Sequence, residues 1–404
     1  MLRFIPPAGT PLGLGQIVRA VRTALVVANG RKNDSLGSLA SLFSVRHAWG
    51  VSSGRAALWV ILKALHQLRS DRCIVALPAY TCFTVPAAIV RAGLELYPVD
   101  IEPETLDFNF SQLEALPEQK LLCILTANLF GLLNDVSRVQ QIARGKEAFV
   151  VDDAAQALGA FRAGHPAGTL GDVGFYSLGR GKALAAMEGG IIVTNSDEIA
   201  RAIHSETRVL LSGSFFHNAR LLAEMLAYSA FLKPRLYWIP NSLPFLKLGV
   251  TEFDPSFPIR GLTALTRGIL PGLMENLTEV NEVRKSNAAT ITQALIGIRH
   301  FTTPKPAPDC QPTYIRFPLL AKDENARNRA VQSLQAIGIG ARVSYPSAVC
   351  DIPGIHPHMA SKAFHRPQAE QVAKKLLTVP VHPLVCQQDL TRIVNVLRDL
   401  DAND

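Results

Sequence analysis

Several features that would place a chain outside the globular enzymes are missing from this sequence. No run of about 18 uninterrupted apolar residues occurs, so no segment is predicted to span a membrane. Pro6 and Pro7 stand where a secretory signal peptide would need an apolar helix. The six cysteines include no C-x-x-C pair, and Cys73 and Cys123 lie in apolar runs typical of buried strands. These absences favour a reduced, cytoplasmic protein.

Long basic tracts, low-complexity segments and internal repeats are also absent. The formal net charge is +8, but the arginines and lysines recur singly or in pairs along the chain. Dispersed positive charge of this kind favours small anionic ligands over nucleic acid. With 404 residues, 48% of them hydrophobic and 18% charged, the chain can bury a large core.

Short apolar runs alternate with helical patterns in the first half of the chain, which predicts an α/β fold. The predicted strands cover 73–77, 94–99, 121–125, 148–151 and 191–194, and helices are predicted at 55–68 and 85–92. Such alternation is typical of a mostly parallel sheet with helices on both faces. Later residues are mainly helical, with one long helix predicted over 273–298, and end in an α+β unit. We expect a large domain over 15–250 and a small one over 251–404.

Polar residues follow several of the predicted strands. Asp100 follows one, Asp152-Asp153 another, and Ser177 and Lys182 a third. Open α/β sheets bind their ligands at the carboxyl ends of the strands. The functional site is therefore expected at this edge.

Lys182 lies in the strongest motif, Gly174-Phe-Tyr-Ser-Leu-Gly-Arg-Gly-Lys-Ala. A phosphate-binding P-loop would need glycine at position 176 and Ser or Thr at position 183, where Tyr176 and Ala183 stand. A surface lysine would not explain the serine and the glycines around it. A Schiff-base lysine would, because burial at a sheet end lowers the pKa of an amine and makes it nucleophilic.

A second motif, Phe149-Val-Val-Asp-Asp-Ala-Ala-Gln, ends a predicted strand in two acids. Pyridoxal chemistry needs a carboxylate at the ring nitrogen, so that the protonated ring can accept electrons from the substrate. Asp153 fits that role, and Asp152 is interpreted as a cap or a neighbouring hydrogen-bond acceptor. An acid at a strand end is often only a helix cap, but Lys182 one strand later favours the cofactor.

A third motif, Ser52-Ser-Gly-Arg-Ala, opens a predicted helix. The free N–H groups and positive end of a helix form an anion site, here including Gly54, Arg55 and Ala56, to which Ser177 could add a hydroxyl. Without the other motifs, an ordinary capped helix explains the pattern equally well.

Taken together and in this order, the motifs resemble the DegT/StrS family of sugar aminotransferases. Pro78-Ala-Tyr-Thr, the stretch Arg91-Ala-Gly-Leu-Glu-Leu-Tyr-Pro-Val-Asp and Leu129-Phe-Gly add to the resemblance. It implies the pyridoxal-phosphate transferase fold of type I and pyridoxal 5'-phosphate as cofactor. By position it implies Lys182 as the cofactor-binding lysine, Asp153 at the ring nitrogen, Gln156 beside the ring, and Ser177, Gly54 and Arg55 at the phosphate.

The resemblance also implies a function. An amino acid, by analogy glutamate, would donate nitrogen to a keto sugar, nucleotide-linked in the family, and two copies of the chain would form a homodimer. Two alternatives remain: a non-catalytic or regulatory protein of this fold, and a transferase acting on another substrate, such as a lipid-linked one.

The sequence departs from the family pattern at four places. Arg55 replaces the usual Thr or Ser, and Asn128 stands where His is frequent. Cys82 occupies the place of the aromatic residue that stacks on the ring, for which Tyr80 or Phe83 could substitute. The Asn-Tyr-Arg loop of the partner subunit is not recognisable, and Phe257-Pro-Ile-Arg260 is a candidate substitute.

Three weaker candidates complete the list of hypotheses. His356-Pro-His358 lacks further ligands at metal-binding spacing, so no metal site is predicted. Cys350 has no electropositive neighbours that would activate a thiol, which favours a structural role. Residues 219–248 are unusually apolar, with Leu222, Leu226 and Ala230 on one helical face. They are interpreted as a subunit contact or a cover over the site, and alternatively as a peripheral membrane contact.

Overall fold

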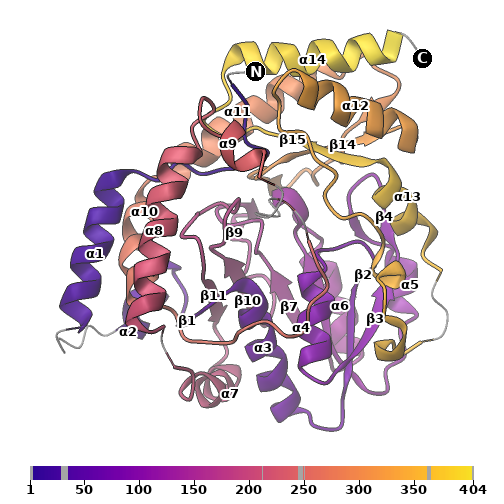
Figure 1. Ribbon diagram of the computed structural model, residues 1–404. Coiled ribbons are helices and arrows are strands. Elements are labelled where there is room, and N and C mark those ends of the chain that lie inside the picture. Colours follow the sequence, from indigo (N-terminus) through magenta and orange to yellow (C-terminus); the bar gives the residue numbers. More distant parts are fainter. Residues whose placement is uncertain are drawn as a thin grey trace.

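The computed structural model describes residues 3–28, 35–211, 213–243, 249, 251–361 and 365–402 (Figure 1). Its centre is a seven-stranded sheet, in which only one strand runs against the others. In spatial order the strands are β1 (His47–Val51), β11 (Gly190–Thr194, the antiparallel one), β10 (Val173–Ser177), β7 (Phe149–Asp153), β6 (Leu121–Ala127), β2 (Ile74–Pro78) and β3 (Glu95–Val99). The predicted α/β fold with a mostly parallel sheet is confirmed.

Helices cover both faces of this sheet, as predicted, because successive side chains of each strand point to opposite sides. Val75 and Val151 belong to one hydrophobic cluster with α3 (Gly54–Leu68), α4 (Thr84–Arg91) and α7 (Asp197–Thr207). Ala76 and Val150, one residue away, belong to a different cluster with α5 (Phe110–Glu114) and α6 (Val136–Gly145). Both faces are apolar, which explains why these strands are continuous hydrophobic runs in the sequence.

Three helices lie side by side along the β1–β11 end of the sheet: α1 (Leu14–Ala28), α8 (Phe215–Phe231) and α10 (Ala264–Glu275) (Figure 1). Ile191 and Val193 of β11 share a core with Leu221 and Met225 of α8. Two short helices, α2 (Ser35–Leu42) and α9 (Trp238–Asn241), lie at the ends of this layer.

A small three-stranded sheet has a hydrophobic core of its own, to which Phe317 and Ile393 contribute. It consists of β12 (Phe301–Thr302), β14 (Phe317–Ala321) and β15 (Leu376–Val379), packed with α11 (Leu277–Ala294), α12 (Glu324–Ala336), α13 (Pro367–Lys375) and α14 (Gln387–Ala402). The remaining strands are β4 (Ile101–Glu102), β5 (Asp107–Phe108), β8 (Phe161–Arg162), β9 (His165–Pro166) and β13 (Cys310–Gln311). A C-terminal α+β unit is thus present, while the boundary between residues 250 and 251 stays a prediction.

The prediction of a single helix over 273–298 is wrong. The chain forms two helices here, since α10 ends at Glu275 and α11 begins at Leu277, with Asn276 between them. Leu273 and Leu277 are both buried, so the apolar spacing continues through the break and does not reveal it. No helix in the described part of the chain is both long and apolar enough to cross a membrane.

Candidate active site

A cavity of about 410 Å³ opens at the carboxyl edge of the central sheet. The strands β10, β7 and β6 are neighbours in the sheet and end at Ser177, Asp153 and Ala127, all of which line this cavity. The other lining residues are Ser53, Gly54, Arg55, Leu58, Thr81, Cys82, Thr84, Val85, Asn128, Leu129, Ala155, Gln156, Phe175, Lys182, Thr251, Glu252 and Asp254. The edge of the sheet where the sequence predicted a site therefore carries a polar cavity.

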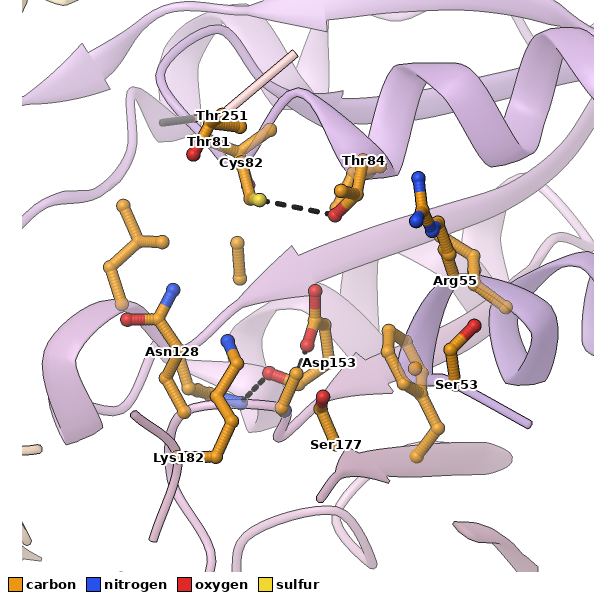
Figure 2. A pocket seen from close by; sticks show the side chains of 18 of the residues that line it. Ser53, Arg55, Thr81, Cys82, Thr84, Asn128, Asp153, Ser177, Lys182 and Thr251 are labelled. Carbon is orange, nitrogen blue, oxygen red and sulfur yellow. Dashed lines mark hydrogen bonds between the residues drawn. The ribbon is translucent and has the colours of Figure 1, made fainter. Parts of the chain in front are cut away.

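Lys182 and Asp153 extend toward the same space within the cavity, and Cys82 and Thr84 lie across from them (Figure 2). Among the described residues, no hydrogen bond engages the Lys182 amine. Burial lowers the pKa of this amine, and the positive charge of Arg316 lowers it further against the opposing effects of Cys82 and Asp153. A lowered pKa increases the neutral, nucleophilic fraction of the amine.

Asp153 presents a carboxyl group with spare hydrogen-bonding capacity. Its Oδ1 accepts a hydrogen bond from the Ala155 N–H at 2.9 Å, and no described residue donates to Oδ2. Burial raises the pKa of this carboxyl from 3.8 to about 7, against the Ala155 N–H and the Lys182 charge, which favour the ionised form. A buried carboxyl that accepts only one hydrogen bond is suited to a cationic partner in the cavity, because such a partner would stabilise its ionised form.

Asp152, the preceding residue, has a different role. Its Oδ2 accepts from the Gly168 N–H at 2.7 Å and the Leu170 N–H at 3.2 Å, and its Oδ1 accepts from Asn128 Nδ2 at 2.7 Å. It is fully buried and holds the loop after β9 against the sheet, which confirms its interpretation as a hydrogen-bond acceptor. Asn128 in turn donates to the Asp153 carbonyl at 2.8 Å, so it fixes the backbone that carries Asp153.

The start of α3 forms an anion cradle with Ser177. Ser53 caps the helix, accepting the Ala56 N–H at 3.1 Å, and first-turn N–H groups have no partner within a helix. A Cβ atom on Gly54 would lie only 2.9 Å from Ser177 Cβ, so glycine is required for this close approach. Gly54, Arg55 and Ser177 all line the cavity, whereas Ala56 is fully buried and its N–H is taken by the cap.

Arg55 adds a positive charge beside this cradle (Figure 2). Its guanidinium lies 5.1 Å from the centre of the buried Phe257 ring, and that of Arg91 lies 4.6 Å from the same ring. The backbone of the segment that carries Phe257 is held by Ser52, whose N–H donates to the Arg260 carbonyl at 2.9 Å. Cation–π contact therefore positions Arg55, which has no acidic partner within the part of the chain that the structure describes.

Gln156 lines the cavity and is fixed at both ends. Its Oε1 accepts from the Phe130 N–H at 3.1 Å, and its Nε2 donates to the Tyr345 hydroxyl at 2.8 Å. Tyr345 also packs against Tyr80 and Phe83, with ring centres 5.5 Å and 6.4 Å away.

The two aromatic residues considered as substitutes for a stacking ring, Tyr80 and Phe83, are buried and do not line the cavity. Tyr80 was expected at the cofactor, and its packing against Tyr345 explains why it is turned into the core instead. Cys82 does line the cavity, with its Sγ 3.1 Å from Thr84 Oγ1. Phe175 is the aromatic residue among the described lining residues.

Sequence reasoning missed one wall of the cavity, formed by Thr251, Glu252 and Asp254. They lie far along the chain from the strand ends and in no regular element, so no periodic pattern marks them. Thr81 and Thr84 were missed as well, although Thr81 ends the Pro78-Ala-Tyr-Thr stretch and both lie close to Cys82 in the sequence.

The weaker candidates lie elsewhere. Within the described residues, no group of three or more His, Cys, Asp or Glu side chains could hold a metal, and His356 Nε2 is bonded to the Cys350 carbonyl at 2.9 Å. Cys350 is buried, and burial raises the pKa of its thiol to about 11. Part of the apolar segment, 244–248, lies outside the described residues; in α8 the buried positions are Leu221 and Met225, while Leu226 is 45% exposed. Its membrane contact stays a prediction.

Pyridoxal phosphate fits the residues of this cavity. The glycine-dependent cradle offers N–H groups and a hydroxyl to a phosphate, and the free oxygen of Asp153 suits a protonated ring nitrogen. The unbonded amine of Lys182 faces the same space and can condense with an aldehyde.

Comparisons with known proteins agree with this geometry. The DegT/DnrJ/EryC1/StrS aminotransferase family matches residues 15–231 and 260–398. The UDP-N-acetyl-3-dehydro-alpha-D-glucosamine 3-aminotransferase of Acidithiobacillus ferrooxidans is 26% identical over 89% of this chain and 86% of its own length. The pleiotropic regulatory protein of Geobacillus stearothermophilus is 27% identical over 89% of this chain and 87% of its own length.

A solved structure of the Escherichia coli GDP-4-keto-6-deoxy-D-mannose-3-dehydratase with bound hydrated pyridoxal phosphate superposes with a TM-score of 0.78. It covers 98% of this chain and 100% of its own, at 19% identity, and so shows the shared fold. The family match spans most of the chain and includes every strand end that lines the cavity. The chain belongs to the DegT/DnrJ/EryC1/StrS aminotransferase family and is a pyridoxal-phosphate-dependent enzyme.

Proposed function

We propose that this enzyme transfers an amino group from an amino acid, glutamate by analogy, to the keto group of a nucleotide-linked sugar. The observation that carries the proposal is the convergence of the Lys182 amine, the Asp153 carboxyl and the α3 anion cradle on one cavity. The Acidithiobacillus relative, named for amino transfer to a UDP-linked keto sugar, supports this substrate class.

Pyridoxal phosphate, when bound, supplies an electron sink for the pair released when the substrate loses its α-proton. Asp153 would hold the ring nitrogen protonated, because its buried carboxylate is stabilised by a neighbouring cation. The Gly54 and Arg55 N–H groups and the Ser177 hydroxyl would hold the phosphate.

Lys182 would bind the cofactor and, once displaced by the amino donor, move the proton. Its lowered pKa lets the neutral amine take the proton from the donor α-carbon and then deliver it as the ammonium. Burial is the main cause of that lowered pKa, so the same packing that positions the amine also increases its neutral, basic fraction.

Gln156 and Asn128 would act as positioning residues. Gln156 is held between the Phe130 N–H and the Tyr345 hydroxyl, which fixes its amide beside the cavity. Asn128 ties Asp152 to the Asp153 carbonyl, so the ring-facing carboxyl sits on a backbone that cannot shift freely.

Arg55 and the overall charge of +8 would favour an anionic acceptor such as a sugar nucleotide. Among the described residues Arg55 has no acidic partner, and it lines the cavity beside the phosphate cradle, so it can pair with a substrate phosphate. The carbon that receives the amine and its stereochemistry depend on the acceptor.

The regulatory alternative draws on the Geobacillus relative, whose name describes regulation. A protein with no catalytic role would not require a buried amine and a buried carboxyl in one cavity.

We also propose a cytoplasmic homodimer. All six cysteines are free, which suits a reducing compartment. Phe215 and Phe216 are 80% and 83% exposed at the start of α8, and side chains of this kind are usually covered by a partner. Sedimentation velocity would test the dimer: a single monomeric species at micromolar concentration would refute it.

The function is tested by following the visible absorbance of the purified holoenzyme. Addition of an amino donor should bleach the band, and a keto-sugar nucleotide should restore it, while the same nucleotide without a keto group should not. Bleaching that no keto sugar in a UDP-, GDP- or dTDP-linked panel reverses would contradict the proposed acceptor class but leave the cofactor assignment intact.

A further inference from the structure

A second cavity, of about 570 Å³, lies next to the loop that carries Lys182 and shares no lining residue with the candidate active site. Arg180 and Gly181, which immediately precede Lys182, form one side of it. Residues of α8 and α9 form another side, and Arg316 a third. Its volume is in the range of small-molecule sites.

Most of the wall of this second cavity is apolar. The aliphatic and aromatic lining residues are Pro7, Ala8, Ala227, Tyr228, Phe231, Leu232, Tyr237, Ile239, Pro240 and Leu243. Tyr228 is one of the few side chains here with a polar end, and its hydroxyl already accepts the Thr10 N–H at 3.2 Å. The wall therefore offers contact area to an apolar group and little hydrogen bonding to a nucleobase.

The charged lining residues are three arginines and one acid. Glu224 is shared by two of them: Arg220 Nε donates to its Oε1 at 2.8 Å, and Arg180 Nη2 lies 4.0 Å from its Oε2. Arg316 has no acidic partner and no hydrogen bond among the described residues, although it is only partly exposed. The cavity thus has an excess of positive charge centred on Arg316.

Arg316 also lies close to the cofactor lysine. A Cβ atom on Gly181 would be 3.8 Å from Arg316 Nη2, and Gly181 adopts a left-handed φ of 76°. The neighbouring Arg342 is occupied, since its Nη2 donates to Asn241 Oδ1 at 2.7 Å. A guanidinium left with free N–H groups in such a place is suited to a phosphate or a carboxylate.

We propose that this second cavity binds an amphiphilic anion, with its phosphate or carboxylate group on Arg316 and a single apolar chain along α8 and α9. The cation of Arg316 and the apolar wall meet in one cavity, and only a ligand that is both anionic and apolar contacts both. This inference concerns binding alone and does not depend on the proposed acceptor.

Calorimetric titration of the holoenzyme tests the proposal with decyl phosphate below its micelle concentration, decanoate, inorganic phosphate and UDP as probes. Decyl phosphate should bind at least about 100-fold more tightly than inorganic phosphate, because each buried methylene adds roughly fourfold. Binding of decanoate as well would show that any anionic head is accepted, and its absence would assign the site to phosphates.

Two variants test separately the binding of the phosphate group and of the alkyl chain of decyl phosphate. Arg316→Gln should weaken decyl phosphate by about tenfold or more, the loss expected for a charge-assisted hydrogen bond. Ala227→Trp, at an exposed position on the rim, should weaken decyl phosphate by filling the space of the chain, without affecting the fold. Arg398→Gln, an exposed arginine on α14 away from the cavity, is the matched control and should bind like the unmodified enzyme.

The proposal is wrong if decyl phosphate binds no more tightly than inorganic phosphate, if both cavity variants bind it normally, or if UDP displaces it from the Arg316-dependent site. None of these results requires turnover, so the proposed amino transfer can fail while this site is confirmed, or hold while it is refuted.

Discussion

Replacement of Asp153 by asparagine should make the cofactor-free protein more stable at alkaline pH. The carboxyl is buried, and its pKa rises from 3.8 in an unfolded chain to about 7 in the folded one. The folded state therefore binds the proton more tightly, and raising the pH from about 4 to about 7 progressively destabilises it. Three units at 1.36 kcal/mol each amount to about 4 kcal/mol, a value that already includes the opposing effect of the Lys182 charge.

Asparagine keeps the shape and can still accept the Ala155 N–H, but it carries no charge at any pH. For a chain of 404 residues, an unfolding entropy of about 2.1 cal/mol/K per residue converts this energy into a rise of roughly 2–5 °C in melting temperature.

The assay is thermal unfolding of both cofactor-free proteins at pH 5 and pH 8. The difference in melting temperature, variant minus unmodified, should be small at pH 5, where Asp153 is still protonated in the folded chain and only part of the destabilisation has accumulated, and clearly larger at pH 8. A difference that does not change between the two pH values would refute the reasoning. With cofactor, Asp153→Asn should lose affinity, since the ring nitrogen loses its anionic partner.

Further predictions concern Lys182, Gly54 and Asp152. Lys182→Ala should abolish the visible band and the bleaching by amino donor, and a fully active variant would refute the assignment. Gly54→Ala should weaken cofactor binding about tenfold in a fluorescence titration, because the new Cβ meets Ser177 at 2.9 Å, while Gly179→Ala, with 3.7 Å to its nearest neighbour, should not. Asp152→Ala should lower the free energy of unfolding in urea by more than about 3 kcal/mol, since four hydrogen-bond donors, most of them buried, lose this acceptor.

The strands and the location of the site could be predicted from the sequence because they depend on local pattern. A short, continuously apolar run such as residues 121–125 indicates a strand that is buried on both faces. Parallel strands place their carboxyl ends on one edge, so Asp153 and Ser177 were expected to meet although 24 positions separate them. The break between α10 and α11 at Asn276 has no such local signal, because the apolar spacing continues through it.

Long-range packing is what the sequence could not supply. Tyr80 precedes a loop that does reach the cavity, but its orientation depends on Tyr345, which lies in another part of the chain. Likewise Arg316 directly precedes β14, and its exposure to the second cavity depends on where α8 and α9 lie. Side-chain direction at such positions is decided by partners distant in sequence.

The pair Asp152-Asp153 shows how one feature of backbone geometry separates structure from chemistry. The two carboxyl groups belong to one strand, and because neighbouring side chains alternate, they point to opposite sides. Asp152 accepts four hydrogen bonds and serves to hold the structure together, whereas Asp153 accepts one and faces a cavity that contains the Lys182 amine. The fold thus leaves an amine and a carboxyl incompletely satisfied in the same place, at a cost in stability that a cofactor with a cationic ring nitrogen and a reactive aldehyde would offset.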